Sequence, residues 1–186
     1  MLDLMFVTSF GNWKFDGDAE GTYQENEYNS EGQVVGFTTT EYAYALDGLY
    51  VGDMPQTAYI LGVTVKPVKG LQLQAIHKTY DKNYSDWSPG AREYDGTDAD
   101  ADRSQVWEAP GYSRLDLHMS YKLPKINDLD MTLTGHIFNV LDEVYVQDAV
   151  DNSRYNSYGS KQHLAHNAEV FLGTPRYANI GLTINF

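Results

Sequence analysis

Three aspartates in the polar segment 84–112 have a spacing that could bind a hard cation. Asp98, Asp100 and Asp102 alternate along the chain, so in an extended loop their carboxylates project to one side. The calcium loop of an EF-hand requires glycine at its sixth position and glutamate at its twelfth. Arg103 and Ala109 occupy these positions. We therefore expect a solvated acidic surface loop here, with no metal and no cofactor.

Aromatic residues of the two longest polar segments are the candidate ligand-binding residues. Tyrosine and tryptophan rings can stack on a ligand, and they can equally pack one loop against another. Both roles remain open for these side chains. The candidates are Trp87, Tyr94 and Trp107 in the first segment and Tyr155 and Tyr158 in the second.

Two histidines, His163 and His166, lie in the second polar segment beside Gln162 and Asn167. A spacing of three places two imidazoles on one face only where the chain is helical. A metal centre also needs further ligands, and no third ligand is evident. We therefore expect an ordinary polar loop.

The sequence does not indicate a catalytic centre. The chain has no cysteine, which excludes thiol nucleophiles, disulfides and zinc–thiolate sites. The Gly-x-Ser-x-Gly nucleophile motif does not occur. The adjacent carboxylates of Asp142 and Glu143 are expected to fix the exit of a strand into a loop rather than to transfer protons. We expect no enzyme.

Composition excludes some partners. The 186 residues include 26 acidic and 13 basic ones, a net charge of -13. Nucleic-acid binding needs a basic surface, so we expect no nucleic-acid partner. No apolar run approaches the roughly 18 residues of a membrane-spanning helix. The N-terminal residues lack the features of a signal peptide, and the length suits one domain.

The elements that must position these residues are strands, because apolar and polar residues alternate along much of the chain. In the clearest case, Leu115, Leu117 and Met119 share one face, and Asp116 and His118 share the other. We expect about eight strands in one continuous sheet. The patterns cover residues 2–14, 18–28, 34–46, 57–66, 71–84, 114–123, 129–137 and 177–186.

The connections between these strands are unequal. Segments 28–34, 65–70 and 123–130 are short, whereas 85–111 and 142–176 are longer than compact domains usually contain. Tight turns on one rim and long loops on the other are typical of outer-membrane barrels. Strips of about 9–11 residues suffice to cross a bilayer when tilted. We therefore expect an all-β, antiparallel transmembrane β-barrel segment with short periplasmic turns and long extracellular loops. His77, His118 and His136 would then face its lumen.

Three stretches resemble the C-terminal end of TonB-dependent outer-membrane receptors. "PGYSRLDLHMSYKL" (110–123) is similar to the third-from-last strand, and "GHIFNVLDEVYV" (135–146) to the penultimate strand and its Asn-Leu-Phe-Asp-Glu-x-Tyr element. "GTPRYANIGLTINF" (173–186) is similar to the Gly-x-Pro-Arg loop and closing strand. Their order and spacing match, although Val140-Leu141 replaces the usual Leu-Phe pair. Residues 1–109 resemble Bacteroidetes-like members only loosely, through "FGNWKF" and "DGLYVGDMPQTA".

The resemblance implies a cellular context. The closing strand resembles the signal that the barrel assembly machinery recognises, carried here by Tyr177, Ile180, Leu182, Ile184 and Phe186. Such receptors resemble 22-stranded barrels with an N-terminal plug, which pass energy from TonB to the uptake of iron-siderophores, haem, cobalamin or glycans. Residues 1–186 would be the C-terminal part of such a barrel in the outer membrane of a Gram-negative cell, without plug or signal peptide.

The implied partners are outer-membrane lipid, the remaining strands and plug, the barrel assembly machinery and, through the plug, the TonB complex. Alone, the chain would not transport. Two alternatives stay open. Eight strands also suffice for a complete small barrel, and a soluble, glycan-binding β-sandwich would show the same alternation.

Overall fold

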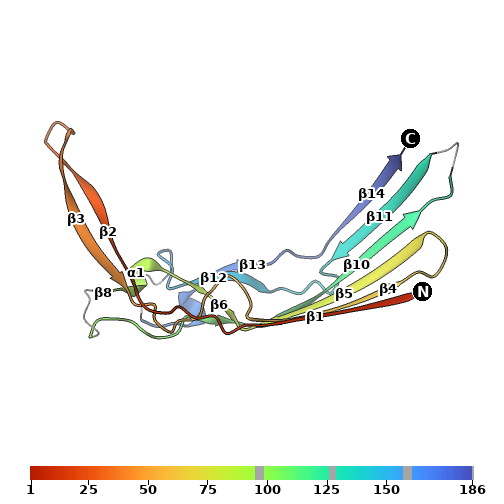
Figure 1. Cartoon of the computed structure of the whole chain (residues 1–186), viewed down its shortest axis with the longest axis horizontal. Helices are drawn as coiled ribbons and strands as arrows, with labels where there is room; N and C mark the ends of the chain where they lie inside the picture. Colours follow the sequence, from red (N-terminus) through yellow and green to blue (C-terminus); the bar gives the residue numbers. More distant parts are fainter. Residues whose placement is uncertain (95–98, 126–128, 157–160, 186) are drawn as a thin grey trace.

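The computed structural model describes residues 1–94, 99–125, 129–156 and 161–185, which form an all-β protein (Figure 1). Each of the eight predicted strands coincides with one of eight long strands. These are β1 (Leu2–Phe10), β2 (Ala19–Tyr28), β3 (Val34–Tyr44), β4 (Thr57–Val65), β5 (Leu71–Asp81), β10 (Tyr112–Lys122), β11 (Asp130–Phe138) and β14 (Tyr177–Asn185).

Short elements occupy the long connections between these strands. They are β6 (Asn83–Tyr84), β7 (Asp86–Trp87), the helical turn α1 (Pro89–Arg92), β8 (Glu93–Tyr94), β9 (Glu108–Ala109), β12 (Val146–Asp151), the 3-10 turn η1 (Ala165–Asn167) and β13 (Glu169–Leu172). No helix in the described ranges is long and apolar enough to cross a membrane.

Six of the long strands form one antiparallel sheet in the order β1-β4-β5-β10-β11-β14. The prediction of one continuous sheet of eight strands is wrong, because β2 and β3 pair with each other and with β8 instead. Since β1 and β4 are direct neighbours, no place remains between them. The chain leaving β1 pairs with the chain entering β4, through Phe15 N–H to Leu49 O (2.9 Å) and Val51 N–H to Trp13 O (3.1 Å), and so carries the β2–β3 hairpin beyond the sheet (Figure 1).

The register of the six-stranded sheet separates apolar from polar residues. On β10, Leu117 lies opposite Ala75 and Ile137, and each pairs again with an apolar residue. This apolar face includes Leu2, Leu4, Phe6, Leu61, Val63, Val65, Leu73, Ala75, Leu115, Leu117, Met119, Leu133, Ile137, Ile180, Leu182 and Ile184. The opposite, polar face includes Asp3, Thr64, Gln74, Lys78, Arg114, Asp116, His118, Thr132, His136, Asn179 and Thr183. The faces predicted for β10, with Leu115, Leu117 and Met119 opposite Asp116 and His118, are confirmed.

The core of the described protein lies in the long connections and not on the sheet. Leu4, Phe6 and Ile180 of the apolar face are 71%, 67% and 81% exposed. By contrast, Ala45, Leu46, Leu49, Val106, Tyr145, Ala149 and Ala168, all outside the six-stranded sheet, are buried. The loops therefore pack into a layer of their own, called the loop layer below.

Turns and loops lie at opposite ends of the six-stranded sheet. β4 and β10 end, and β5 and β11 begin, at the end of the sheet where β1 begins and β14 ends, and the long connections leave from the other end (Figure 1). This agrees with the predicted rims, except for the short turn 28–34. It forms the tip of the β2–β3 hairpin, on the far side of the loop layer from the other two turns (Figure 1).

Candidate functional site

The three motif stretches meet where β10, β11 and β14 enter the loop layer. Asn139, which follows β11 with φ of 50°, donates from its amide Nδ2 to the carbonyls of Glu143 (2.9 Å) and Thr174 (3.2 Å). Its backbone N–H donates to Asp116 Oδ1 at 3.0 Å. One buried asparagine thus binds residues of all three stretches, which fixes the exits of the three strands relative to one another.

Asp142 makes a second link between the stretches. Its Oδ1 accepts from Arg176 N–H at 2.9 Å, and Arg176 Nη2 lies 3.7 Å from Asp142 Oδ2. Asp142 has φ of 56°, in the left-handed region that single Asp and Asn residues tolerate. The predicted role of the Asp142–Glu143 pair, to fix the strand-to-loop exit, is confirmed for Asp142.

Tyr145 makes the third link. Its ring stacks on Tyr112 at 4.2 Å between centroids, and its hydroxyl accepts from Arg114 Nη1 at 3.1 Å. Gly173 N–H donates to Tyr145 O at 2.9 Å. A Cβ at Gly173 would overlap the Tyr145 ring, so this approach requires glycine.

A buried charge cluster holds the loop layer together. It comprises Arg92 of α1, Asp102, Asp151 of β12 and His163, whose side chains are 1%, 4%, 1% and 7% exposed. His163 Nε2 lies 3.0 Å from Asp102 Oδ2, and its Nδ1 is hydrogen-bonded to Asp151 Oδ2. Arg92 Nη1 donates to the carbonyls of Asp102 (2.8 Å) and Ser104 (2.7 Å).

Electrostatics favour the charged forms of the acid and the base in this cluster. Burial alone would lower the pKa of His163, but its bond to Asp151 and the charge of that carboxylate raise it above the ordinary 6.5. Burial would likewise raise the pKa of Asp102. The backbone N–H of Ser104, the bond to His163 and the charge of Arg92 outweigh burial and lower it.

A second ionic contact ties the base of the β2–β3 hairpin to the loop layer. Arg103 Nη1 and Nη2 donate to both oxygens of Asp18, at 2.9 and 2.8 Å. Asp18 also accepts from the N–H groups of Leu46 (2.9 Å) and Asp47 (3.0 Å), and from the hydroxyl of Tyr94 (2.8 Å). Arg103 and these backbone donors hold the pKa of Asp18 far below its ordinary value.

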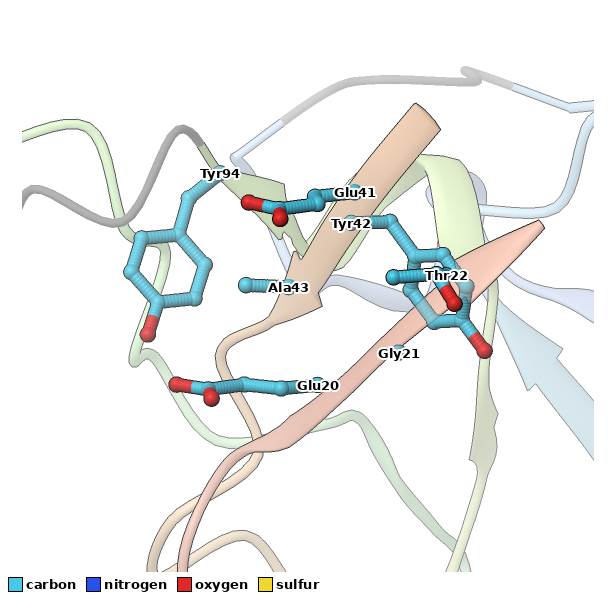
Figure 2. Close-up of a pocket in the computed structure, with 7 residues that line it drawn as sticks. All are labelled: Glu20, Gly21, Thr22, Glu41, Tyr42, Ala43 and Tyr94. Carbon is cyan, nitrogen blue, oxygen red and sulfur yellow. The ribbon is translucent and has the colours of Figure 1, made fainter. Parts of the chain in front are cut away.

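An acidic pocket of about 530 Å³ opens beside this contact, lined by Glu20, Gly21, Thr22, Glu41, Tyr42, Ala43 and Tyr94. Ala43 pairs with both Glu20 and Tyr94, so these residues share one face of the sheet. Figure 2 shows the carboxylates of Glu20 and Glu41 and the Tyr94 ring on the same side of the hairpin. Carboxylates beside an aromatic wall suit a ligand with hydrogen-bond donors or positive charge and one flat face.

The structure does not bring the predicted ligand-binding residues into one site. Tyr94 lines the acidic pocket, but Trp87, Trp107 and Tyr155 are not among its lining residues. The Trp87 ring lies 5.3 Å from that of Tyr44, and Tyr155 is 80% exposed beneath the Arg154 guanidinium. Trp107 is half-buried, and its carbonyl accepts from Ser85. Tyr158 lies outside the described residues.

Two predictions about the polar loops are wrong. Asp102 was expected on a solvated acidic surface and His163 in an ordinary polar loop, yet both are buried. The two segments pack against each other, so that Arg92 of the first and Asp151 of the second enclose both side chains. Asp100 and His166 are exposed, as expected, and Asp98 lies outside the described residues. Among the residues that the structure describes, no three His, Asp or Glu side chains could hold a metal ion together.

Sequence reasoning missed Arg92 and Asp151. Neither belongs to a motif, and the Arg92 partners Asp102 and His163 lie 10 and 71 residues away along the chain. The only signal was an arginine within a segment rich in aspartate, which identifies no partner.

The strand histidines divide between the two faces. His118 and His136 lie on the polar face, with their Nδ1 atoms 2.9 Å apart. His77 pairs with Leu61 and Leu115 on the apolar face. Its expected position on the polar face is wrong, because it stands one residue out of phase with Lys78.

The closing strand presents the residues of the expected insertion signal. Ile180, Leu182 and Ile184 lie on the apolar face and are 81%, 55% and 41% exposed. Tyr177 lies on the other face, with its ring stacked on Phe138 at 4.7 Å. Phe186 lies outside the described residues.

Comparisons with known proteins add no assignment. No protein-family model, no curated protein and no solved structure matches this chain. The case for a function therefore depends on the geometry of the sheet and of the loop layer.

Proposed function

We propose that this chain forms part of the wall and of the outer rim of a TonB-dependent type β-barrel in a Gram-negative outer membrane. The six-stranded sheet is the wall, its apolar face meets lipid, and its polar face lines the lumen. The loop layer is the extracellular rim. The chain contributes to the uptake of a scarce ligand by the whole barrel and does not transport alone.

The observation that carries this proposal is the continuous apolar face of a six-stranded sheet. Soluble monomers rarely expose an apolar patch larger than a few hundred Å², yet strands of nine or more residues present such a face here. A soluble sandwich would cover it with a second sheet. The three smaller sheets of the described residues belong instead to the loop layer and the β2–β3 hairpin.

The junction of the motif stretches supports the receptor type within this class. Asn139, Asp142 and Tyr145 of one stretch contact Asp116, Arg176 and Gly173 of the other two. The residues that carry the resemblance are therefore in contact in the folded chain. Their spacing along the sequence did not require these contacts.

A pair of substitutions on β14 tests the membrane orientation of the faces. Leu182→Arg places a charge on the apolar face and should cost roughly 2–4 kcal/mol near mid-bilayer, whereas an arginine on a lumen-facing position should cost much less. Thr183→Arg, on the polar face opposite Thr132, is the matched control. Assembly is measured as the fraction of chain folded into outer-membrane vesicles.

Equal loss for both variants would contradict the assignment of the faces. Recovery of the unmodified chain in the aqueous fraction, folded and monomeric, would overturn the membrane proposal itself. The acidic pocket would then have to be explained as part of a soluble binding protein.

A further inference from the structure

We propose that His163 is an imidazolium in the folded protein and acts as a proton-dependent latch, whose deprotonation loosens the wall of the acidic pocket. This inference goes beyond the proposed function. It depends only on contacts within the loop layer and would hold whether or not the sheet lies in a membrane.

The carboxylates around His163 favour two protons on the ring. Both ring nitrogens face carboxylates, Nε2 towards Asp102 Oδ2 at 3.0 Å and Nδ1 towards Asp151 Oδ2. A neutral imidazole has one N–H, so it would direct a lone pair at one of the two carboxylates. The imidazolium donates to both and binds them as a charged pair of hydrogen bonds.

The charges in the cluster balance only when His163 is protonated. Asp102 comes from the 99–107 loop, Asp151 from β12 and Arg92 from α1, and the three side chains are at most 4% exposed. Arg92 Nη2 and Asn152 Nδ2 also approach His163 Nδ1, at 3.2 and 3.1 Å. With the imidazolium, two positive groups meet two negative ones. Without it, a buried net negative charge remains, which low-dielectric surroundings strongly disfavour.

The latch connects to the acidic pocket through residues next to it in the chain. Asp102 immediately precedes Arg103, which grips Asp18 with both guanidinium nitrogens. Arg92 stands two residues before Tyr94, the aromatic wall of the pocket, whose hydroxyl donates to the same Asp18. Loss of the His163 contact therefore weakens the hold on the segment that positions Arg103, although Arg92 still donates to the carbonyls of Asp102 and Ser104.

The direction of the pH effect follows from the shifts already described. The pKa of His163 is raised above 6.5, so the latch contributes fully below that pH and is lost as the pH rises through the folded-state value. The pKa of Asp102 is lowered below 3.8, so its contribution is present above that value and lost only in stronger acid. The latch is therefore closed in mildly acidic medium and opens in alkaline medium.

Hydrogen exchange of the full chain in detergent tests the latch. Protection factors, corrected for intrinsic exchange, are followed over residues 99–107 from pH 5 to pH 9. Because opening releases one proton, we expect protection to fall by up to about tenfold per pH unit between the ordinary pKa of 6.5 and the raised folded-state pKa of His163, and to level off above it. His163→Gln should show low protection and no such pH dependence. His166→Gln, which changes an exposed histidine three residues away, should behave like the unmodified chain.

A second measurement covers the case in which His163→Gln does not fold. Nitrogen-15 spectra of histidine-labelled, unmodified protein at pH 6 should show both ring nitrogens of His163 protonated. A neutral ring at pH 6, or the same pH dependence of protection in the His163→Gln and His166→Gln variants, would overturn the latch. Neither result would affect the β14 test of membrane orientation, so the two proposals fail separately.

Discussion

At the scale of single residues, the junction between sheet and loops depends on backbone conformations and close contacts that few side chains permit. Asn139 and Asp142 both have positive φ, and each uses its side chain to bind the next strand exit. Gly173 packs against the ring of Tyr145. These positions fix three strand ends relative to one another.

Gly173→Ala should destabilise the folded chain by about 1–3 kcal/mol, because the new Cβ must displace a ring already stacked on Tyr112. Denaturant unfolding in detergent, followed by tyrosine fluorescence, measures this loss. Gly135→Ala is the control. A Cβ there would meet Met119 and Ile180 at ordinary contact distances of 3.6 and 3.9 Å, so its effect should be small. Equal effects at both positions would contradict the proposed contact.

At the scale of elements, the β2–β3 hairpin stands apart from the six-stranded sheet and is held at its base. Its aromatic residues form a ladder, with ring centroids 6.1 Å apart for Tyr23–Tyr42, 5.1 Å for Tyr42–Tyr44 and 5.3 Å for Tyr44–Trp87. The ladder rings lie on the face opposite Glu20, Glu41 and Tyr94. Asp18 anchors the start of β2 to Arg103. The hairpin is therefore an arm of the loop layer.

Asp18→Asn should weaken this anchor by about 1 kcal/mol, since the Arg103 side chain is 37% exposed and solvent screens the pair. Limited proteolysis should then cut faster after Lys14 and Arg103. The pKa of Asp18 is depressed, so its contribution is present above the ordinary 3.8 and lost only as pH falls through the much lower folded value. Asp16→Asn, at an exposed carboxylate two residues away, should leave the cleavage rates unchanged. If Asp16→Asn accelerated cleavage as much as Asp18→Asn, the proposed anchoring role of Asp18 would be contradicted.

At the scale of the whole molecule, the six-stranded sheet is open along both edges. In the described residues β1 pairs with β4 and β14 with β11, and each of these edge strands has nine residues. Unpaired amide and carbonyl groups in lipid cost several kcal/mol each. The proposed barrel therefore needs further strands at both edges.

The 186-residue chain folded alone in detergent should associate through these edges, because exposed edge strands template pairing with other chains. Light scattering should show mass increasing with protein concentration, and gel migration should show no heat-modifiable compact monomer. A complete eight-stranded barrel run alongside provides the reference for closure. A stable, heat-modifiable monomer of the chain would favour the alternative of a self-standing small barrel.

The sequence by itself determined which residues form the long strands and, except for His77, which face most of them occupy, because alternation of polar and apolar residues is a local property of an extended chain. It also located the three stretches that meet at Asn139 and Tyr145. Only the tertiary structure decided that β2 and β3 leave the sheet. The reason is that β1 pairs directly with β4, which leaves no position for β2 and β3 between them. Only the tertiary structure brought Arg92, Asp102, Asp151 and His163 into one buried cluster. Ion pairs between loops leave no periodic pattern in the sequence, unlike the alternation of a strand. The order of residues therefore could not identify these partners.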